Sequence, residues 1–326
     1  MRRTITVLAV AMFAVAGCGS PARQQAVGWS YRDDRGVTVT AERRPVRIVA
    51  QVSAAGALQD FGVRAVGTFG PLVRDDGSTE PEAGSVDPRA VTDVTGPGYG
   101  EINLERLASL HPDLLVSGKY AGYPGLWHLT EEQERMVRRV VPTLGVRQSG
   151  ISLPDSIARY RELARALGGD VDSPRVRADE AAFHAAAQRL RDIGTRMRAE
   201  GRTILAVGGT EQEYFVVAPQ RNPDLDFYVR ELGLPITAPR HPDTASGGYF
   251  ERLSWENAGA YRADVLLWDA RPASLPPERM KQNPVFAAQP AAAANRFVEW
   301  DAVAPMSYAS YTRIMNRLAA QLDTVD

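Results

Sequence analysis

The chain has 326 residues, and its 38 lysines and arginines against 39 aspartates and glutamates give a formal net charge of −1. A nucleic-acid-binding protein would show a strong basic excess or a basic stripe, so the charge balance argues against that class. Hydrophobic residues make up 44% of the sequence, which supports a sizeable core, and a chain of this length usually folds as two domains.

The N-terminus has the order of a secretory signal peptide. A basic start (Met1–Arg3) precedes the apolar run ITVLAVAMFAVA (5–16), which is too short for a membrane-spanning helix of ~20 residues. The following V-A-G-C resembles a bacterial lipobox and contains Cys18, the only cysteine. We therefore expect residues 1–17 to be removed, Cys18 to carry lipid, and 18–28 to form a lipidated, flexible tether. The alternatives are an ordinary signal peptide with an incidental cysteine, or a membrane anchor.

The first half of the chain alternates short apolar runs with helical patterns. The predicted strands are RIVAQ (47–51), RAVGTF (64–69), LLVS (114–117) and TLGVR (143–147). Helices are predicted over SAAGALQDFG (53–62) and EEQERMVRRV (131–140), and residues 70–90 read as loop. Strands separated by helices indicate parallel α/β units.

A long helix is predicted in the middle of the chain. Ser173 is a good N-cap, Pro174 suits the first turn, and Gly201 ends the pattern. Apolar residues recur between these limits at steps of three and four: Phe183, Ala186, Leu190, Ile193 and Met197. This spacing predicts one amphipathic helix of ~27 residues.

After this helix the α/β pattern resumes. Strands are predicted at 203–209, 214–218, 265–270 and 296–300, with helices within 223–233 and over 308–322. We therefore predict two Rossmann-like α/β lobes joined by one long helix, with a cargo cleft between them. The predicted boundaries are 29–170 for the N-terminal lobe, 171–201 for the connecting helix and 202–326 for the C-terminal lobe. The alternative is a single large doubly wound sheet.

Two segments repeat the same spacing 151 residues apart, namely NLERLASLHPDLLVS (103–117) and SWENAGAYRADVLLW (254–268). Each has an N-cap residue, a glutamate two positions later (Glu105 or Glu256), and an aspartate before an apolar strand. Each is predicted to form a short helix, a tight turn and a strand, which favours duplicated lobes. A helix dipole alone could explain the glutamates, since it stabilises a carboxylate in the first turn by ~0.3–1 kcal/mol.

The order of these motifs resembles a known family. The lipobox is followed by DDRGVTVT (33–40), RRPVRIVAQVSAAGALQDFGVRAVGT (43–68) and INLERLASLHPDLLVSG (102–118). This series is similar to the periplasmic binding proteins that serve ABC importers of iron–siderophore complexes, haem and vitamin B12. The resemblance implies a monomeric carrier on the outer face of the cytoplasmic membrane, with no catalysis and no cofactor apart from iron within its cargo. It also implies that Glu105 and Glu256 dock onto arginines of the permease.

The resemblance further implies a cargo site of aromatic and arginine side chains, which suit the apolar faces and oxygen-rich edges of a ferric siderophore. The candidates are Tyr99, Tyr120, Tyr123, Trp127, Tyr214, Arg240, Tyr249, Trp268, Arg271, Met306 and Tyr308. In hydroxamate binders of this family, Tyr99, Tyr120, Tyr249 and the Met306–Tyr308 region correspond to positions near cargo. Tyr99 stands where arginine is expected, which weakens the hydroxamate interpretation. Core packing is the alternative for each aromatic residue, especially Phe215 and Trp268.

Other functions have less support in the sequence. The four histidines, His111, His128, His184 and His241, show no metal-ligand spacing, so no metal site is predicted. No nucleophile elbow, Walker loop or zinc-protease motif is present, which argues against an enzyme. The alternatives that remain open are haem or cobalamin as cargo, a repurposed cell-envelope lipoprotein or sensor, and a secreted α/β enzyme.

Overall fold

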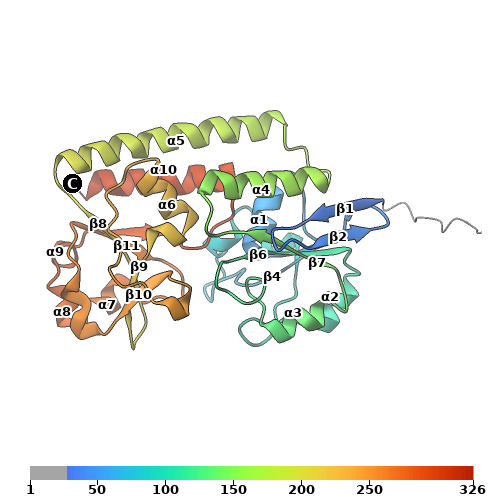
Figure 1. Cartoon of the computed structure of the whole chain (residues 1–326), viewed down its shortest axis with the longest axis horizontal. Helices are drawn as coiled ribbons and strands as arrows, with labels where there is room; N and C mark the ends of the chain where they lie inside the picture. The colour runs from blue at the N-terminus through green and yellow to red at the C-terminus, as the bar shows by residue number, and fades with distance from the viewer. Residues whose placement is uncertain (1–27, 326) are drawn as a thin grey trace, which may run out of the picture.

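The computed structural model describes residues 28–325, so the predicted signal peptide, Cys18 and most of the tether lie outside the described residues. Two five-stranded sheets lie side by side, with a two-stranded hairpin at one end (Figure 1). One sheet takes its strands from before the long helix and the other from after it. We call the elements around these sheets the N-terminal and C-terminal lobes. The two-lobed α/β prediction is confirmed, and the residue boundaries of the lobes stay a prediction.

The N-terminal sheet is entirely parallel. Its order is β5 (Thr92–Asp93), β4 (Gly67–Phe69), β3 (Ile48–Gln51), β6 (Leu114–Lys119) and β7 (Thr143–Arg147). The helices of this lobe are α1 (Val52–Asp60), α2 (Leu104–Ser109), α3 (Glu131–Val137) and α4 (Leu153–Ala166). Every residue of β3 is buried, as expected for a parallel strand covered on both faces.

Three elements of this lobe are not evident in the sequence pattern, and the shortest is β5, with two residues. A second is α4, which follows the N-cap residue Ser152, whose hydroxyl accepts a hydrogen bond from the Asp155 N–H. The third is the hairpin of β1 (Trp29–Arg32) and β2 (Thr38–Ala41), which pair antiparallel. Each strand of the hairpin has only four residues, too few to give a clear alternating pattern.

The C-terminal sheet is mixed. Its order is β10 (Phe250–Leu253), β9 (Tyr214–Val217), β8 (Ile204–Gly209), β11 (Val265–Asp269) and β12 (Phe297–Trp300). Strands β8, β11 and β12 are parallel, whereas β9 and β10 run antiparallel to their neighbours. The α/β class predicted for this lobe is confirmed, with a mixed sheet in place of the all-parallel sheet of the N-terminal lobe. Only four residues separate β8 from β9, and a connection this short allows only an antiparallel hairpin.

The α-helices of the C-terminal lobe are α6 (Pro223–Arg230), α7 (Pro277–Met280), α8 (Pro284–Ala287), α9 (Pro290–Ala293) and α10 (Tyr308–Thr324). Single 3-10 turns lie at Pro81–Ala83, Pro88–Ala90, Pro219–Arg221 and Thr244–Ser246, and a longer 3-10 helix spans Trp255–Ala260. The last of these corrects the prediction that both repeated segments form the same helix. Asn103 caps α2 through its side chain, whereas Ser254 makes no side-chain capping bond and Gly259, inside the 3-10 helix, disfavours a regular α-helix.

The long helix α5 (Pro174–Ala199) begins after Ser173, whose hydroxyl accepts from the Val176 N–H, as predicted. In Figure 1, α5 runs along the top of both lobes, with α10 beneath it over the C-terminal lobe and α4 beneath it over the N-terminal lobe. The largest hydrophobic cluster is continuous through α1, α4, α5, α10 and the inner faces of both sheets. At this junction Asp60 accepts hydrogen bonds from Ser307 Oγ (2.5 Å) and Ser310 Oγ (3.2 Å). Because the core is shared, the lobes have limited freedom to move apart.

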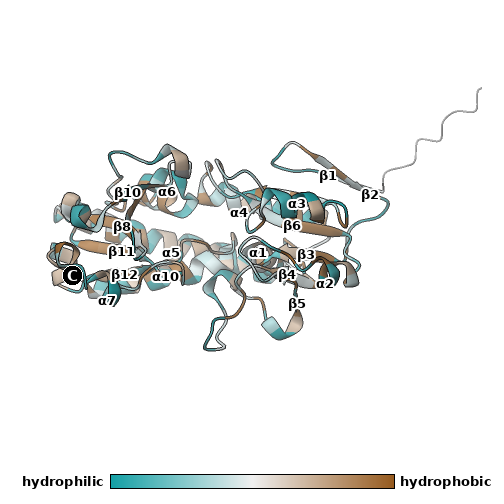
Figure 2. Cartoon of the chain, turned by 90° about the horizontal axis from the view of Figure 1, so that it is seen from below, coloured by the Kyte–Doolittle hydropathy of each residue, from teal (hydrophilic) through white to brown (hydrophobic). Residues whose placement is uncertain are grey.

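Hydropathy follows this layering. In Figure 2 central strands such as β6 and β11 are hydrophobic, while the helices around them carry hydrophilic outer residues. Among residues 28–325, no helix is both long and apolar enough to cross a membrane.

Candidate functional site

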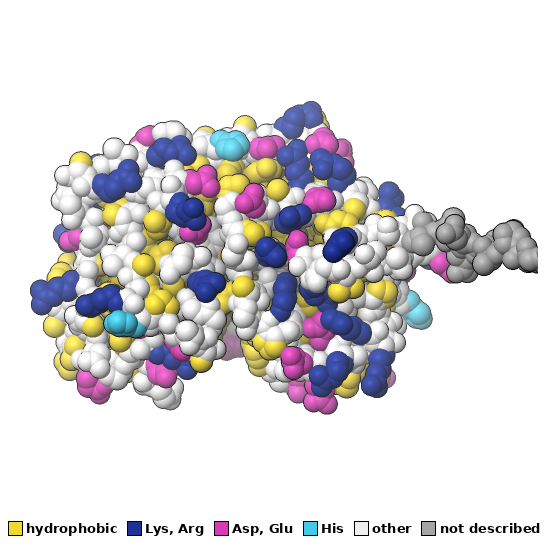
Figure 3. Space-filling model, in the orientation of Figure 1, with side chains coloured by type: hydrophobic (Ala, Val, Ile, Leu, Met, Phe, Trp, Pro, Cys, Tyr) yellow, Lys and Arg dark blue, Asp and Glu magenta, His cyan; other side chains and the backbone are white. Residues whose placement is uncertain are grey.

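A cavity of about 530 Å³ lies between the two lobes, and we call it the main cavity. Its lining includes Tyr120, Tyr123 and Trp127 from the N-terminal lobe, and Phe215, Tyr249, Phe250, Arg252, Asp269, Arg271 and Trp300 from the C-terminal lobe. Figure 3 shows the molecule hollowed between the lobes at its lower edge. Most of these residues follow or end β6, β11 and β12, so the cavity lies at the carboxyl ends of parallel strands, where α/β folds usually bind ligands.

The wall from the N-terminal lobe is aromatic. The ring centroid of Trp127 lies 4.7 Å from that of Tyr120 and 5.4 Å from that of Tyr123. Burial, together with the charge of Glu82, raises the pKa of Tyr120 well above its ordinary value, and burial also raises that of Tyr123. Both phenols therefore stay protonated at neutral pH. They present apolar faces together with hydroxyl groups that can hydrogen-bond to a ligand.

Arg271 supplies a positive charge to the opposite wall. Its Nε lies 2.9 Å from Asp269 Oδ1, and its Nη2 lies 2.6 Å from Asp269 Oδ2. Burial alone would lower the pKa of Arg271, but the hydrogen bonds and charge of Asp269 raise it above the ordinary value. No hydrogen bond joins Nη1 of Arg271 to another residue within 28–325. This nitrogen is therefore free to donate to an oxygen-rich ligand.

The lobes touch beside the cavity. The Tyr249 hydroxyl donates to the Ala121 carbonyl oxygen at 2.9 Å and lies 2.8 Å from Ser149 Oγ. Gly122 lies so close to Gly247 that a Cβ on Gly122 would stand 3.1 Å from the Gly247 Cα, and its φ of +81° also favours glycine. Tyr249 thus lines the cavity and joins its two walls.

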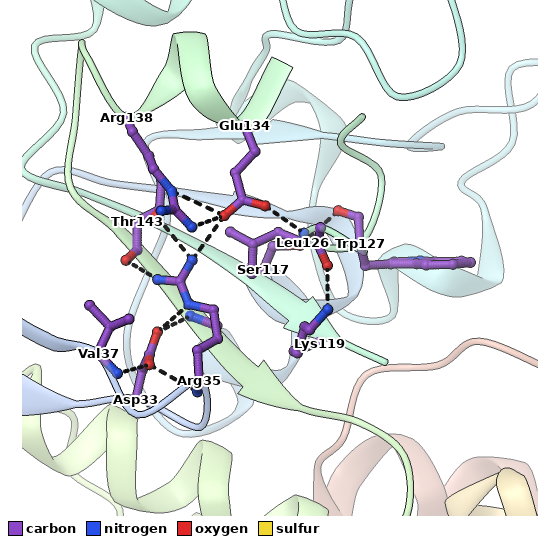
Figure 4. Close-up of polar contacts among 12 residues, drawn as sticks. Asp33, Arg35, Val37, Ser117, Lys119, Leu126, Trp127, Glu134, Arg138 and Thr143 are labelled. Atoms are coloured by element: carbon purple, nitrogen blue, oxygen red, sulfur yellow. Dashed lines mark hydrogen bonds and ion pairs between the residues drawn. The ribbon is translucent and has the colours of Figure 1, made fainter. Parts of the chain in front are cut away.

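Polar anchors hold the loop that carries the aromatic wall (Figure 4). Glu134 Oε2 accepts the Leu126 N–H at 2.9 Å, and Ser117 Oγ donates to the Trp127 carbonyl at 2.8 Å. Lys119 Nζ donates to the carbonyls of Tyr123 and Gly125. These bonds fix the backbone of the loop, so the position of the Trp127 ring does not depend on ring packing alone.

Glu134 also belongs to a buried ion-pair network, shown in Figure 4. Arg35 Nε lies 2.6 Å from Asp33 Oδ2, Arg35 Nη1 lies 3.0 Å from Glu134 Oε1, and Arg35 Nη2 donates to the Thr143 carbonyl at 2.6 Å. Arg138 pairs with Glu134 from the surface side. The side chains of Arg35, Asp33 and Glu134 are 11%, 0% and 9% exposed. The network ties the turn between β1 and β2 to β7, to α3 and, through Glu134, to the aromatic loop.

A buried carboxylate lies behind Trp300 on the other side of the cavity. Asp224 Oδ2 accepts a hydrogen bond from Trp300 Nε1 at 2.7 Å. Burial raises the pKa of Asp224 to about 6, against the lowering effect of this hydrogen bond. The folded protein therefore takes up a proton at Asp224 at a higher pH than the unfolded chain does.

This shift predicts a pH dependence of stability. A raised carboxyl pKa makes the group destabilising above about pH 6, and the penalty falls as the pH drops below that value. Between about pH 7 and pH 5 the native chain should gain about 1 kcal/mol of unfolding free energy relative to Asp224→Asn, which cannot titrate. Urea denaturation of both proteins at each pH measures the difference. Asp192→Asn, on the exposed side of α5, controls for the loss of one negative charge. An Asp224→Asn difference that does not change with pH would contradict the assignment.

The structure brings together some of the predicted cargo residues. Tyr120, Tyr123, Trp127, Tyr249 and Arg271 line the main cavity. Tyr99 lines a smaller adjoining cavity that shares Trp127 and Arg271 with it. These six side chains therefore converge between the lobes, and their contact with cargo stays a prediction.

The other five candidates lie away from both cavities. Tyr214 is fully buried in the outer core of the C-terminal lobe, against Phe286, and Trp268 packs on the same cluster. Met306 is buried in the shared core, and the Tyr308 hydroxyl donates to Glu180 Oε1 at 3.0 Å. Arg240 is exposed, donates to the Ala260 carbonyl and lies over the Tyr261 ring. For these residues a structural role explains the position.

Strand alternation explains why Tyr214 and Trp268 face the core while their neighbours Phe215 and Asp269 line the main cavity. Successive side chains of a strand point to opposite faces, so Phe215 reaches the cavity because Tyr214 points into the core. In the same way Asp269 reaches the cavity while Trp268 packs away from it. Phe250, Arg252 and Trp300 were also missed. Phe250 and Arg252 alternate along β10, which the sequence pattern did not reveal as a strand, whereas Trp300 could have been found as the last residue of a predicted strand.

Glu105 and Glu256, the predicted docking residues, are both exposed. Each occupies the first turn of its helix, α2 or the 3-10 helix Trp255–Ala260. Hydrogen bonds from its own backbone N–H and from Ser254 hold the pKa of Glu256 below its ordinary value. Within residues 28–325, no group of three or more histidine, cysteine, aspartate or glutamate side chains is placed to hold a metal ion.

Comparison with known proteins places this architecture in a family. A model of the periplasmic binding protein family matches residues 50–304. The chain is similar to DesE, a ferric-siderophore receptor protein from Streptomyces coelicolor, whose crystal structure is known. The two share 32% sequence identity over 90% of this chain and 98% of DesE, and the structures superpose with a TM-score of 0.82. No curated protein sequence matches the chain.

Two further structures share the fold at lower identity. The siderophore periplasmic binding protein from the fuscachelin gene cluster of Thermobifida fusca is 20% identical over 86% of this chain and 97% of its own, with a TM-score of 0.57. The iron-uptake ABC transporter substrate-binding protein PiuA from Streptococcus pneumoniae shares 17% sequence identity over 89% of this chain and 96% of its own, with a TM-score of 0.62. These relatives are binding proteins and not enzymes. The chain belongs to the periplasmic binding protein family.

Proposed function

We propose that this protein captures a ferric siderophore in the main cavity and delivers it to the permease of an ABC importer. The observation that carries the proposal is the cavity itself, which combines tyrosine and tryptophan faces with the available guanidinium of Arg271 between two lobes. The similarity to DesE, a ferric-siderophore receptor, supports the choice of cargo. In this function the iron is held by the siderophore and belongs to the cargo.

The chemistry of the cavity suits such a cargo. A ferric siderophore has apolar faces, which the Trp127 and Tyr120 rings can cover, and oxygen-rich edges, which Arg271 and the protonated phenols can meet as donors. A volume of about 530 Å³ lies within the usual range of small-molecule sites. Capture then requires only a modest closure, since the two lobes share one core.

Tryptophan fluorescence quenching tests the cargo. Trp127 and Trp300 line the main cavity, so bound cargo should quench their emission. The panel comprises ferrioxamine, ferrichrome, a ferric catecholate, ferric citrate, haem and cobalamin. We expect saturable quenching at sub-micromolar concentration by a ferric siderophore. Quenching by haem or cobalamin alone would replace the proposed cargo, and no quenching by any compound would contradict the proposal.

Delivery is proposed to depend on Glu105 and Glu256 as two exposed anionic docking points, one on each lobe. Reversing both charges, as in Glu105→Arg with Glu256→Arg, should lower siderophore uptake by cells about tenfold while leaving cargo affinity unchanged. Glu162→Arg with Glu200→Arg, exposed on the side of α4 and α5, is the matched charge control. Normal uptake by the docking variant would exclude this role.

Anchoring is proposed at Cys18, which lies outside the described residues. The proposal follows from the V-A-G-C sequence and the position of the sole cysteine. The expected result is that wild-type protein fractionates with the membrane and that Cys18→Ser releases it from the membrane fraction. Immunoblotting of membrane and soluble fractions measures this, and a Cys18→Ser protein that stays in the membrane would contradict lipid attachment at this residue.

A further inference from the structure

A second cavity of about 250 Å³ adjoins the main cavity, and we call it the annex. The two cavities share Trp127, Arg271, Ala273 and Val303 in their linings. The annex lining also includes Glu80, Glu82, Tyr99, His128 and Asp301. A ligand in the main cavity could therefore extend one arm into the annex without leaving the cleft.

Most charged side chains that line the annex already have an ionic partner. Glu80 pairs with Arg74 at 3.1 Å, and Asp301 pairs with Arg317. Arg271 is held by both carboxylate oxygens of Asp269. Of the three carboxylates that line the annex, only Glu82 forms no ion pair with an arginine or lysine of the described residues.

Glu82 is buried without a fully charged partner. It is only 6% exposed, and within residues 28–325 no lysine or arginine lies within ion-pair distance of it. Its Oε1 accepts a hydrogen bond from Gln51 Nε2 at 2.6 Å, and His128 Nε2 lies 3.6 Å from the same oxygen. No described residue donates a hydrogen bond to Oε2. A buried carboxylate normally requires a cation or several donors. The charge of Arg271 acts on Glu82 only from beyond ion-pair distance, and Asp269 already holds that guanidinium, so Oε2 can still accept a hydrogen bond from a second cation.

The walls of the annex suit an organic cation. The His128 ring lies between two aromatic rings, with centroid distances of 5.4 Å to Tyr99 and 5.1 Å to Trp127. Aromatic faces attract ammonium groups, and they also cover the alkyl carbons next to the charge. The annex has about half the volume of the main cavity, so it fits an end group and not a whole iron chelate.

We propose that the annex binds the cationic end of the cargo, a primary ammonium group on a short alkyl arm, beside Glu82. This inference rests on the proposed function, in which the iron chelate itself fills the main cavity. It narrows the cargo class to siderophores that carry a pendant amine. Glu82 then determines specificity: its free oxygen accepts a charge-assisted hydrogen bond from the ammonium group while Gln51 holds the other oxygen.

The test compares two ligands that differ only at this end group, ferrioxamine B and its N-acetyl derivative, which has lost the ammonium charge. Wild-type protein should bind ferrioxamine B about tenfold more tightly than the acetylated form. Glu82→Gln keeps the shape and the contact with Gln51, so it should remove this preference by weakening only ferrioxamine B. Glu131→Gln, an exposed glutamate at the start of α3, should keep the preference. Equal affinities for both ligands in wild-type protein would overturn the proposal and leave the proposed function intact.

If neither ferrioxamine binds, the result counts against the proposed cargo, and a second titration then tests the annex by itself. Pentylammonium, titrated alone at millimolar concentration, should quench the fluorescence of wild-type protein but not of Glu82→Gln, because Trp127 lines the annex. Neutral pentanol is the matched control. Quenching that depends on both the ammonium charge and Glu82 would support the annex as a cation site. The same response in both proteins, or none, would overturn it.

Discussion

Replacing Trp127 by alanine should weaken siderophore binding about a hundredfold, because this ring contributes to both cavities and contacts both neighbouring tyrosines. Buried aromatic anchors in the centre of a binding site typically carry losses of this size. The effect should appear mainly as faster dissociation, since the aromatic face holds the cargo after entry. Calorimetric titration gives the affinity, and stopped-flow fluorescence gives the two rates.

Trp268→Ala is the matched control for this prediction. Trp268 is also a partly buried tryptophan, but it packs against the outer core of the C-terminal lobe and does not line either cavity. The control should lose stability while its cargo affinity stays that of wild type at a temperature where both variants are folded. Equal losses of affinity in the two variants would mean that Trp127 acts through general stability and not through contact with cargo.

Replacing Arg35 by methionine should lower the unfolding free energy by about 3–5 kcal/mol, because it leaves Asp33 and part of Glu134 as uncompensated buried charges. Methionine fills a similar volume, so the loss is chiefly electrostatic. The variant also removes the donor to the Thr143 carbonyl, although the Gly145 N–H still donates to Asp33 and keeps the β1–β2 turn attached to β7. Urea denaturation at neutral pH measures the effect.

Arg138→Met provides the contrast within the same network. Arg138 contacts the same carboxylate oxygen of Glu134, but its side chain is 51% exposed, so its removal should cost less than about 1 kcal/mol. If both variants lose the same free energy, burial is not what makes the Arg35 contacts strong. Arg35→Met should also weaken siderophore binding, since Glu134 holds the Leu126 N–H of the aromatic loop.

Much of the fold could be predicted from local patterns. The N-cap, the apolar spacing and the terminal glycine predict the long helix, and the structure has it at Pro174–Ala199. The buried strands β3, β6, β8 and β11 are short apolar runs bounded by polar residues, which the sequence shows directly. The direction of a strand cannot be predicted from its own apolar pattern, because it depends on how the connections before and after it cross the sheet. The antiparallel pairing of β8 with β9 follows from the short connection between them, whereas the apolar runs alone do not indicate direction.

Residues of the main cavity could be predicted where the sequence shows the end of a strand. Tyr120, Trp127 and Arg271 follow the carboxyl ends of β6 and β11, and all three line the cavity. Tyr214 and Trp268 pack in the core instead, because a one-residue shift along a strand exchanges the cavity face for the core face. The annex could not be predicted, since Glu82, Tyr99 and Asp301 come from three distant loops that only the folded chain brings together.

The shared core connects the fold with the proposed capture mechanism. Helices α5 and α10 bridge both lobes, and the Asp60–Ser307 hydrogen bond lies buried at their junction. A cleft between lobes joined in this way is largely formed before cargo arrives, which reduces the ordering cost of binding. Tyr249, which hydrogen-bonds to the opposite lobe beside the cavity, is the contact that closure or opening would first change.

Anomalous X-ray diffraction at the iron edge, from crystals of the chain without residues 1–18 grown with ferrioxamine B, would locate the bound iron directly. The account predicts one strong iron peak inside the main cavity, between the Trp127 ring and the Arg271 guanidinium, with no protein carboxylate or imidazole as ligand. An iron peak on the outer surface, or iron coordinated by the protein's own side chains, would contradict it.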